Sequence, residues 1–152
     1  SAVIHALEAA LARATAGGDL AMLEPYLRAR EIEIALIEER GTLVLSPVGE
    51  VLYTGDFYDY DCKYNSPQTR LSLAALSPVQ NTRVRTYAEK VFRALGLARY
   101  ARLDFFLAES GEIFFNEANT LPGFTAGSMF PFLFGGDLRA LSTRLALAAL
   151  AP

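Results

Sequence analysis

Apolar and polar residues alternate through the middle of the chain, a pattern typical of strands with one buried face. EIEIALIE (31–38) alternates regularly and predicts a strand. Its apolar face holds Ile32, Ile34 and Leu36. TLVLS (42–46) and EVLYT (50–54) predict two further strands, joined through Pro47 and Gly49. These segments therefore predict an antiparallel meander.

Three other segments place apolar residues at helical spacing. The first covers residues 2–14 and ends before a Gly-Gly pair. The second begins at SPVQ (77–80), where the serine is the expected N-cap and the glutamine completes a capping box, and Gly96 ends it. The third begins near Asp137. The expected apolar stripes are Ile4, Leu7, Leu11 and Ala14, then Val84, Ala88, Val91, Phe92 and Leu95, then Leu138, Leu141 and Leu145.

Two strongly apolar runs, ARLDFFL and IFFNEAN, flank the segment ESGE (109–112) and predict a hairpin whose turn is the Ser-Gly pair. With a two-residue turn there, Asp104 lies opposite Glu117 and Arg102 lies opposite Asn119. The charged and amide groups then share one face of the hairpin. The other face is expected to hold Phe105, Leu107, Phe114 and Asn116.

Between the predicted sheet and the second helix lies GDFYDYDCKYNSPQTR (55–70), which is polar, aromatic and without periodicity. A loop of this length within a compact domain is usually functional or mobile. Lys63 in this loop is either an ordinary exposed lysine or a cation placed for a phosphate.

Composition narrows the class of protein. The chain has 152 residues, 52% of them hydrophobic and 20% charged, enough for one core in a single α+β unit. A net charge of -3 argues against a duplex nucleic-acid partner. One cysteine excludes an internal disulfide and fits a reducing cytosol. No uncharged apolar run is long enough to predict a membrane span.

The predicted hairpin face suggests metal chemistry. Two opposed carboxylates, Asp104 and Glu117, repel each other unless a cation lies between them. With Asn119 they form an all-oxygen donor set, which suits a hard cation such as Mg²⁺. Arg102 beside that cation would stabilise negative charge on a reacting oxygen. The alternative is a solvated sheet face that carries an Arg–Asp pair.

ARLDFFL, IFFNEANTLPGFTAGSMFP and FYDYDCKY together resemble the carboxy-terminal half of the D-alanine–D-alanine ligase family, within the ATP-grasp superfamily. The resemblance implies an ATP-grasp subdomain, a mainly antiparallel sheet flanked by helices. It implies Asp104, Glu117 and Asn119 as ligands of two Mg²⁺ ions, or of Mn²⁺, with Glu117 bridging them. Arg102 and the backbone amide of Gly123 would stabilise the tetrahedral intermediate.

The resemblance also implies sites for nucleotide and substrate. LEPYLRARE (23–31) resembles the family's adenine hinge. The implied ATP contacts are Glu24 and Leu27 at the base edge, Glu31 at the ribose, Phe57 and Phe106 on either side of adenine, and Lys63 at the transferred phosphate. Tyr64 would fasten the closed loop. Ser128 and Met129 would meet the carboxylate end of the second D-alanine.

The implied enzyme is cytoplasmic and homodimeric, with no nucleic-acid or membrane partner. It ligates two D-alanines through an acyl phosphate, at the expense of ATP, for peptidoglycan synthesis. The family's amino-terminal domain and its phosphate-covering loop have no counterpart in residues 1–152. We therefore expect these residues to form a single carboxy-terminal unit that cannot turn over alone.

Other functions stay open at this point. The same hairpin pattern occurs in metal-dependent nucleases, although Asn119 stands where they carry lysine. A non-catalytic nucleotide- and metal-binding module of ATP-grasp type has the same sequence features. Within the ligases, D-lactate is a possible second substrate, and Tyr64 favours the dipeptide-forming enzymes.

Overall fold

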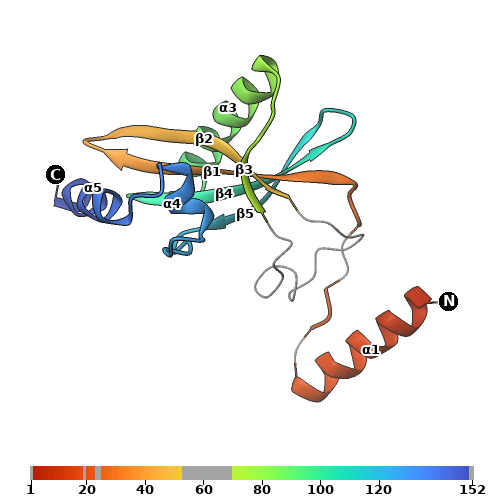
Figure 1. Cartoon of the computed structure of the whole chain (residues 1–152). Coiled ribbons are helices and arrows are strands. Elements are labelled where there is room, and N and C mark those ends of the chain that lie inside the picture. The colour runs from red at the N-terminus through yellow and green to blue at the C-terminus, as the bar shows by residue number, and fades with distance from the viewer. Residues whose placement is uncertain (1, 19, 23–24, 53–69, 151–152) are drawn as a thin grey trace.

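A computed structural model describes residues 2–18, 20–22, 25–52 and 70–150 of the chain. In this part, five strands form one antiparallel sheet of order β3-β2-β1-β4-β5. The strands are β1 (Ala29–Glu39), β2 (Thr42–Leu52), β3 (Arg70–Leu73), β4 (Tyr100–Ala108) and β5 (Ile113–Asn119). The helices are α1 (Ala2–Gly17), α3 (Pro78–Ala94), α4 (Met129–Leu133) and α5 (Leu138–Leu150). The predicted α+β fold is confirmed (Figure 1).

Strand β1 lies at the centre of the sheet and is buried on both faces. Its predicted apolar face, which holds Ile32, Ile34 and Leu36, packs in the same core cluster as α3. Its other face contributes Ala35 and Ile37 to a second cluster with α4 and α5. The alternating pattern predicted the first face only, because Ala35 is small and Ile37 comes near the end of the run.

Strand β2 runs unbroken from Thr42 to Leu52, so the prediction of two separate strands there was wrong. Pro47 lies inside β2 at a β-bulge, where the pairing with β1 shifts by one residue. Proline has no N–H for the ladder and is therefore confined to edges and bulges. At the bulge, the Ala35 N–H donates to Ser46 Oγ at 3.0 Å. This bond satisfies a backbone donor that the bulge leaves without a ladder partner.

The helix α3 begins and ends as predicted. Ser77 Oγ accepts a hydrogen bond from the Gln80 N–H, and Gln80 Oε1 accepts one from the Ser77 N–H at 2.9 Å. Gly96 follows the helix with a φ of +63°, which glycine adopts without steric cost. The buried residues of α3 are Val84, Ala88 and Phe92, whereas Leu95 is exposed and does not belong to the apolar stripe.

The predicted first and last helices are also present. Asp137 Oδ1 accepts a hydrogen bond from the Ala140 N–H at the start of α5, and Leu141 is buried. α1 lies apart from the sheet (Figure 1), and its apolar residues Ile4, Leu7 and Leu11 are exposed. Within the described residues, no helix has the length and apolar character that crossing a membrane requires.

Candidate active site on the β4–β5 hairpin

The hairpin brings the predicted residues together. Asp104 lies opposite Glu117 and Arg102 lies opposite Asn119, as the sequence predicted. Directly opposed residues of an antiparallel pair share one face, with Cβ atoms about 4.5–5.5 Å apart. The sheet therefore presents two carboxylates, a guanidinium and an amide on the face that α4 and α5 cover in part.

The predicted turn, however, was wrong. The turn has three residues, 109–111, because the Ala108 N–H donates to the Glu112 carbonyl at 2.9 Å. Gly111 has a φ of +84°, the left-handed value that three-residue hairpin loops place on glycine. The extra turn residue alone would move the predicted pairs out of register.

A β-bulge in β5 restores the register. Phe105 pairs with Phe115 while Asp104 pairs with Glu117, so Asn116 has no partner on β4. A bulge places one extra residue in one strand and so compensates the longer turn. The expected opposite face was therefore partly wrong. It holds Phe115, whose ring centroid is 5.7 Å from that of Phe105, whereas Phe114 pairs with Phe106 on the face of Asp104.

Arg102 is the centre of a buried charged cluster. Its Nε and Nη2 atoms donate to the two oxygens of Asp104 at 2.8 and 2.7 Å. The same Nε lies 2.7 Å from Oε2 of Glu33, which stands opposite Asp104 on β1. Glu33 and Asp104 are 8% and 9% exposed. An Arg–Asp pair is present as the alternative interpretation required, but it is buried rather than solvated.

Glu33 is a site residue that sequence reasoning missed. In EIEIALIE it falls between the apolar residues Ile32 and Ile34, so alternation alone places it on a polar face. Its position beside Arg102 follows from the β1–β4 pairing, which joins segments far apart in sequence. The available signal was a single carboxylate in a central strand, where burying a charge requires a partner.

The two opposed carboxylates converge on one point. Asn119 Nδ2 donates to Asp104 Oδ2 at 3.0 Å and to Glu117 Oε1 at 3.1 Å. The Asn119 amide nitrogen lies between the two carboxylates, and a flip of the amide would bring its oxygen to the same point. Two carboxylates and one amide oxygen form a donor set that suits a hard divalent cation. Within the described residues, no three His, Cys, Asp or Glu side chains gather as a metal site.

Arg102 keeps its charge in this setting. Burial acts against the charged form, but the hydrogen bond to Asp104 and the charges of Asp104, Glu33 and Glu117 outweigh it and raise the pKa of Arg102. One guanidinium among three carboxylates leaves an excess of negative charge. This excess favours binding of a cation at the cluster.

The residues expected to bind nucleotide are placed in part. Glu31 and Phe106 lie opposite each other on β1 and β4, one alternation step from the pair Glu33 and Asp104 and on the same face. Leu27 precedes β1 and is 38% exposed. Most of the 55–70 loop lies outside the described residues. So do four of the predicted site residues, Glu24, Phe57, Lys63 and Tyr64.

The segment after β5 brings the remaining predicted residues together. A Cβ added to Gly123 would lie 2.9 Å from Ser128 Oγ, so the two residues are in contact. Ser128 Oγ also accepts a hydrogen bond from the Thr125 N–H at 3.1 Å. Met129 is buried, and its Sδ would lie 2.6 Å from a Cβ added to Gly49. A substrate contact of Met129 would therefore come from its backbone.

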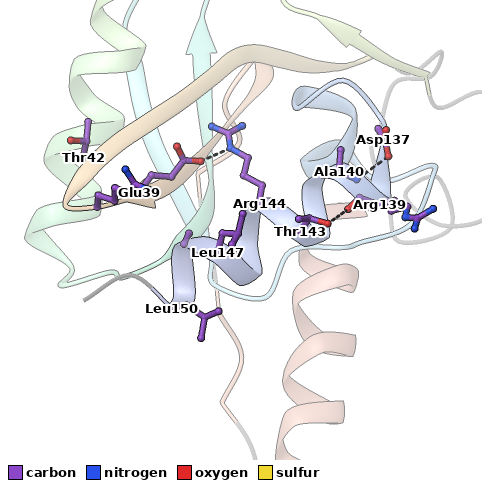
Figure 2. A pocket seen from close by; sticks show the side chains of 11 residues that line it. Glu39, Thr42, Asp137, Arg139, Ala140, Thr143, Arg144, Leu147 and Leu150 are labelled. Atoms are coloured by element: carbon purple, nitrogen blue, oxygen red, sulfur yellow. Dashed lines mark hydrogen bonds and ion pairs between the residues drawn. The ribbon is translucent and has the colours of Figure 1, made fainter.

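A cavity of about 1430 Å³ lies elsewhere, between α5 and the β1–β2 turn (Figure 2). Charged residues line part of it, and Arg144 on α5 pairs with Glu39 across it. None of the sequence-predicted site residues lines this cavity. Glu39 is six residues along β1 from Glu33, roughly 20 Å in an extended strand. We therefore place the candidate site at the charged cluster on the hairpin.

Comparisons with known proteins point to one family. Residues 2–137 match the family model described as D-ala D-ala ligase C-terminus. The chain is 44% identical over 126 residues to a D-alanine–D-alanine ligase of Deinococcus radiodurans, covering 80% of this chain and 37% of the relative. It is also 44% identical over 115 residues to the ligase of Treponema pallidum, covering 74% of this chain and 29% of the relative.

Solved structures show the same likeness. D-alanyl-alanine synthetase A from Vibrio cholerae superposes with a TM-score of 0.66 at 33% identity, covering 82% of this chain and 40% of that one. A D-Ala:D-Ser ligase from Enterococcus faecalis gives a TM-score of 0.66 at 29% identity, covering 82% and 38%. The chain thus spans about a third of the length of these relatives and matches their carboxy-terminal portion. It belongs to the D-alanine–D-alanine ligase family.

Proposed function

We propose that this chain supplies the magnesium- and nucleotide-binding part of an ATP-dependent enzyme that ligates two D-alanines for peptidoglycan synthesis. The observation that carries the proposal is the convergence of Asp104, Glu117 and Asn119 beside a buried Arg102. Family membership supports the reaction class. On this proposal residues 1–152 form one carboxy-terminal ATP-grasp unit of a cytoplasmic, homodimeric enzyme.

The proposed reaction has two steps. The carboxylate of one D-alanine attacks the γ-phosphate of ATP, which gives an acyl phosphate and ADP. The amine of a second D-alanine then displaces phosphate and forms the dipeptide. Phosphoryl transfer of this kind depends mostly on positioning and on neutralising negative charge.

The chain's own residues would divide this work. The residues that would hold Mg²⁺, as two ions, or Mn²⁺ in its place, are Asp104, Glu117 and Asn119. When bound, the cation neutralises charge on the phosphate oxygens. Arg102 would direct its remaining N–H groups to the oxygen that gains negative charge, and the Gly123 N–H would donate to the same oxygen.

Nucleotide and second substrate would lie on either side of this centre. Glu31 would bind the ribose, and Phe106 would stack on adenine with Phe57. The proposed base-edge contacts are Glu24 and Leu27, and Lys63 and Tyr64 would act from the loop. Ser128 and the backbone of Met129 would meet the carboxylate of the second D-alanine.

A chimaeric enzyme tests the proposal. Residues 2–137 of this chain replace the matching part of the Deinococcus radiodurans ligase, and D-alanyl-D-alanine formation is measured with ATP and Mg²⁺. We expect turnover that Arg102→Gln lowers by at least about 100-fold, the usual loss for a donor to a developing oxyanion. Glu89→Gln, an exposed charge loss on α3, is the matched control. A folded chimaera that binds ATP but makes no dipeptide would favour the non-catalytic module.

The choice of second substrate needs its own measurement, because one structural relative is a D-Ala:D-Ser ligase. The chimaera is assayed with D-alanine alone and with D-alanine plus D-serine or D-lactate. We expect dipeptide of D-alanine as the main product. A product that carries mostly D-serine or D-lactate would overturn that part of the proposal.

A further inference from the structure

Glu33 has no role in the proposed reaction, yet it is one of the most buried charged residues in the described part of the chain. Its side chain is 10% exposed, and its Oε2 lies 2.7 Å from Arg102 Nε. It stands on β1 directly opposite Asp104 on β4. Burying a carboxylate costs desolvation free energy even when the carboxylate is paired with a cation. The burial of Glu33 therefore needs an explanation.

The contacts of Asp104 suggest what Glu33 does. Both oxygens of Asp104 accept hydrogen bonds from Arg102, and Oδ2 also accepts one from Asn119. On the proposed function, Asp104 must also give an oxygen to the cation. Arg102 then loses part of the interaction that fixes its guanidinium plane, unless a second carboxylate holds it.

We propose that Glu33 is a positioning residue that anchors Arg102 from β1, so that Asp104 is released to the cation while the guanidinium stays in place. The inference rests on the proposed function, because it assigns Asp104 to the metal. Glu33 acts through Arg102 and touches neither cation nor substrate. The nearest rival is a direct role for Glu33 as a further metal ligand.

Mn²⁺ binding to the 152-residue chain, followed by electron paramagnetic resonance, separates these roles. In the parent background, Glu33→Gln leaves Asp104 as the carboxylate that holds the Arg102 guanidinium. Asp104 must then bind both the guanidinium and Mn²⁺. We expect the affinity for Mn²⁺ to fall about 10-fold, as for other groups that orient metal ligands. In an Arg102→Gln background there is no guanidinium to compete. The same Glu33→Gln change then lowers affinity by less than about 3-fold, the remainder being lost negative charge.

Glu89→Gln is the matched control for charge, since Glu89 is exposed on α3, which covers the other face of the sheet. An equal loss from Glu33→Gln in both backgrounds would show direct ligation and overturn the proposal. No loss in either background would overturn it as well.

A second readout needs no metal and tests the anchor itself. The Arg102 Nε–Hε proton is followed by ¹⁵N NMR, and its exchange with water is measured in the parent, Glu33→Gln and Glu33→Asp. The Nε–H donates to Asp104 Oδ1, and Glu33 adds an ion pair at the same nitrogen. We expect Glu33→Gln to speed exchange about 10-fold, because the variant loses this ion pair. Glu33→Asp, which keeps the charge on a shorter side chain, should fall between the two.

The two readouts also distinguish failure of the inference from failure of the proposed function. A parent chain that binds no Mn²⁺ while Hε exchange responds to Glu33→Gln would refute the metal assignment and keep the anchor. Unchanged Hε exchange in a folded Glu33→Gln chain would refute the anchor even where Mn²⁺ binds normally.

Discussion

At the scale of single residues, the two facing carboxylates of the site have different surroundings. Asp104 is 9% exposed and receives two hydrogen bonds from Arg102, whereas Glu117 is exposed and bonds to Asn119 alone among the described residues. Like-charge repulsion by itself would predict that neutralising either carboxylate stabilises the fold. The contacts indicate that Asp104 stabilises the fold, whereas Glu117 contributes little to its stability.

We therefore predict opposite stability effects for two matched variants. Asp104→Asn weakens two charge-assisted hydrogen bonds and should cost about 1.5–3 kcal/mol, a fall of roughly 5–10 °C in melting temperature. Glu117→Gln should change the melting temperature by less than about 2 °C, as for most exposed positions. Both should abolish the stabilisation that Mg²⁺-ADP gives the parent. Thermal melts with and without Mg²⁺-ADP measure both effects, and an unchanged ligand response in either variant would remove that residue from the metal site.

The residues of the candidate site were predictable where their contacts lie within one short stretch of sequence. Arg102, Asp104, Glu117 and Asn119 belong to one hairpin, so spacing alone placed them together. Glu33 comes from a strand about 70 residues earlier in the chain, and no local pattern states which strand will pair with β4. The missed residue is therefore the one whose contact depends on long-range pairing.

At the scale of elements, the hairpin has the predicted register, but a longer turn and a bulge produce it instead of a two-residue turn. The turn is one residue longer than predicted, and the bulge at Asn116 compensates for it. Turn length in a Ser-Gly hairpin is weakly specified by sequence, because several loop types place glycine at a positive φ. The register was fixed more strongly, since a slip of one residue would move Glu117 and Asn119 to the opposite face of the sheet, where α3 packs.

Deletions in β5 test this account. Removing Asn116 takes out the unpaired residue and should leave Asp104 opposite Glu117, so Mn²⁺ affinity should fall by less than about 10-fold through altered strand twist. Removing Ala118 instead moves Asn119 to the opposite face, since side chains alternate along a strand. That variant should bind no Mn²⁺ at concentrations that saturate the parent. Equal loss in both deletions would show that the bulge itself, rather than the register it restores, is required.

At the scale of the whole molecule, the two faces of the sheet have different coverings. α3 packs on one face, while α4 and α5 cover only part of the other and leave the charged cluster beside them. Gly49 makes this arrangement possible, because it lies opposite Glu33 and lets Met129 and Leu133 approach the backbone of β2. The sequence predicted α5 but not α4, whose five residues are too few for a periodic pattern.

The close contact at Gly49 gives a further prediction. In Gly49→Ala the new Cβ would lie 2.6 Å from Met129 Sδ and 2.8 Å from Leu133 Cδ2, so these side chains, or α4 with them, must shift. Overpacking of this kind costs about 1–3 kcal/mol. Adding Leu133→Val, which shortens one of the two side chains, should recover part of the loss in melting temperature. If the losses in melting temperature from Gly49→Ala and Leu133→Val simply add in the double variant, residues 49 and 133 do not share this contact.

The last prediction concerns the catalytic capacity of residues 1–152 by themselves. They span about a third of the length of related ligases. On the proposed function, their phosphate-neutralising groups come only from the β4–β5 hairpin and from Lys63. A phosphate held from one side is poorly positioned, and misplacement by about 1 Å can cost on the order of 100-fold in rate. We therefore expect weak Mg²⁺-nucleotide binding and no D-alanine-dependent phosphate release from the isolated 152 residues. The chimaera with the Deinococcus radiodurans ligase is the positive control in the same assay. Steady phosphate release by the isolated chain that disappears in Arg102→Gln would show that one hairpin suffices for the transfer step.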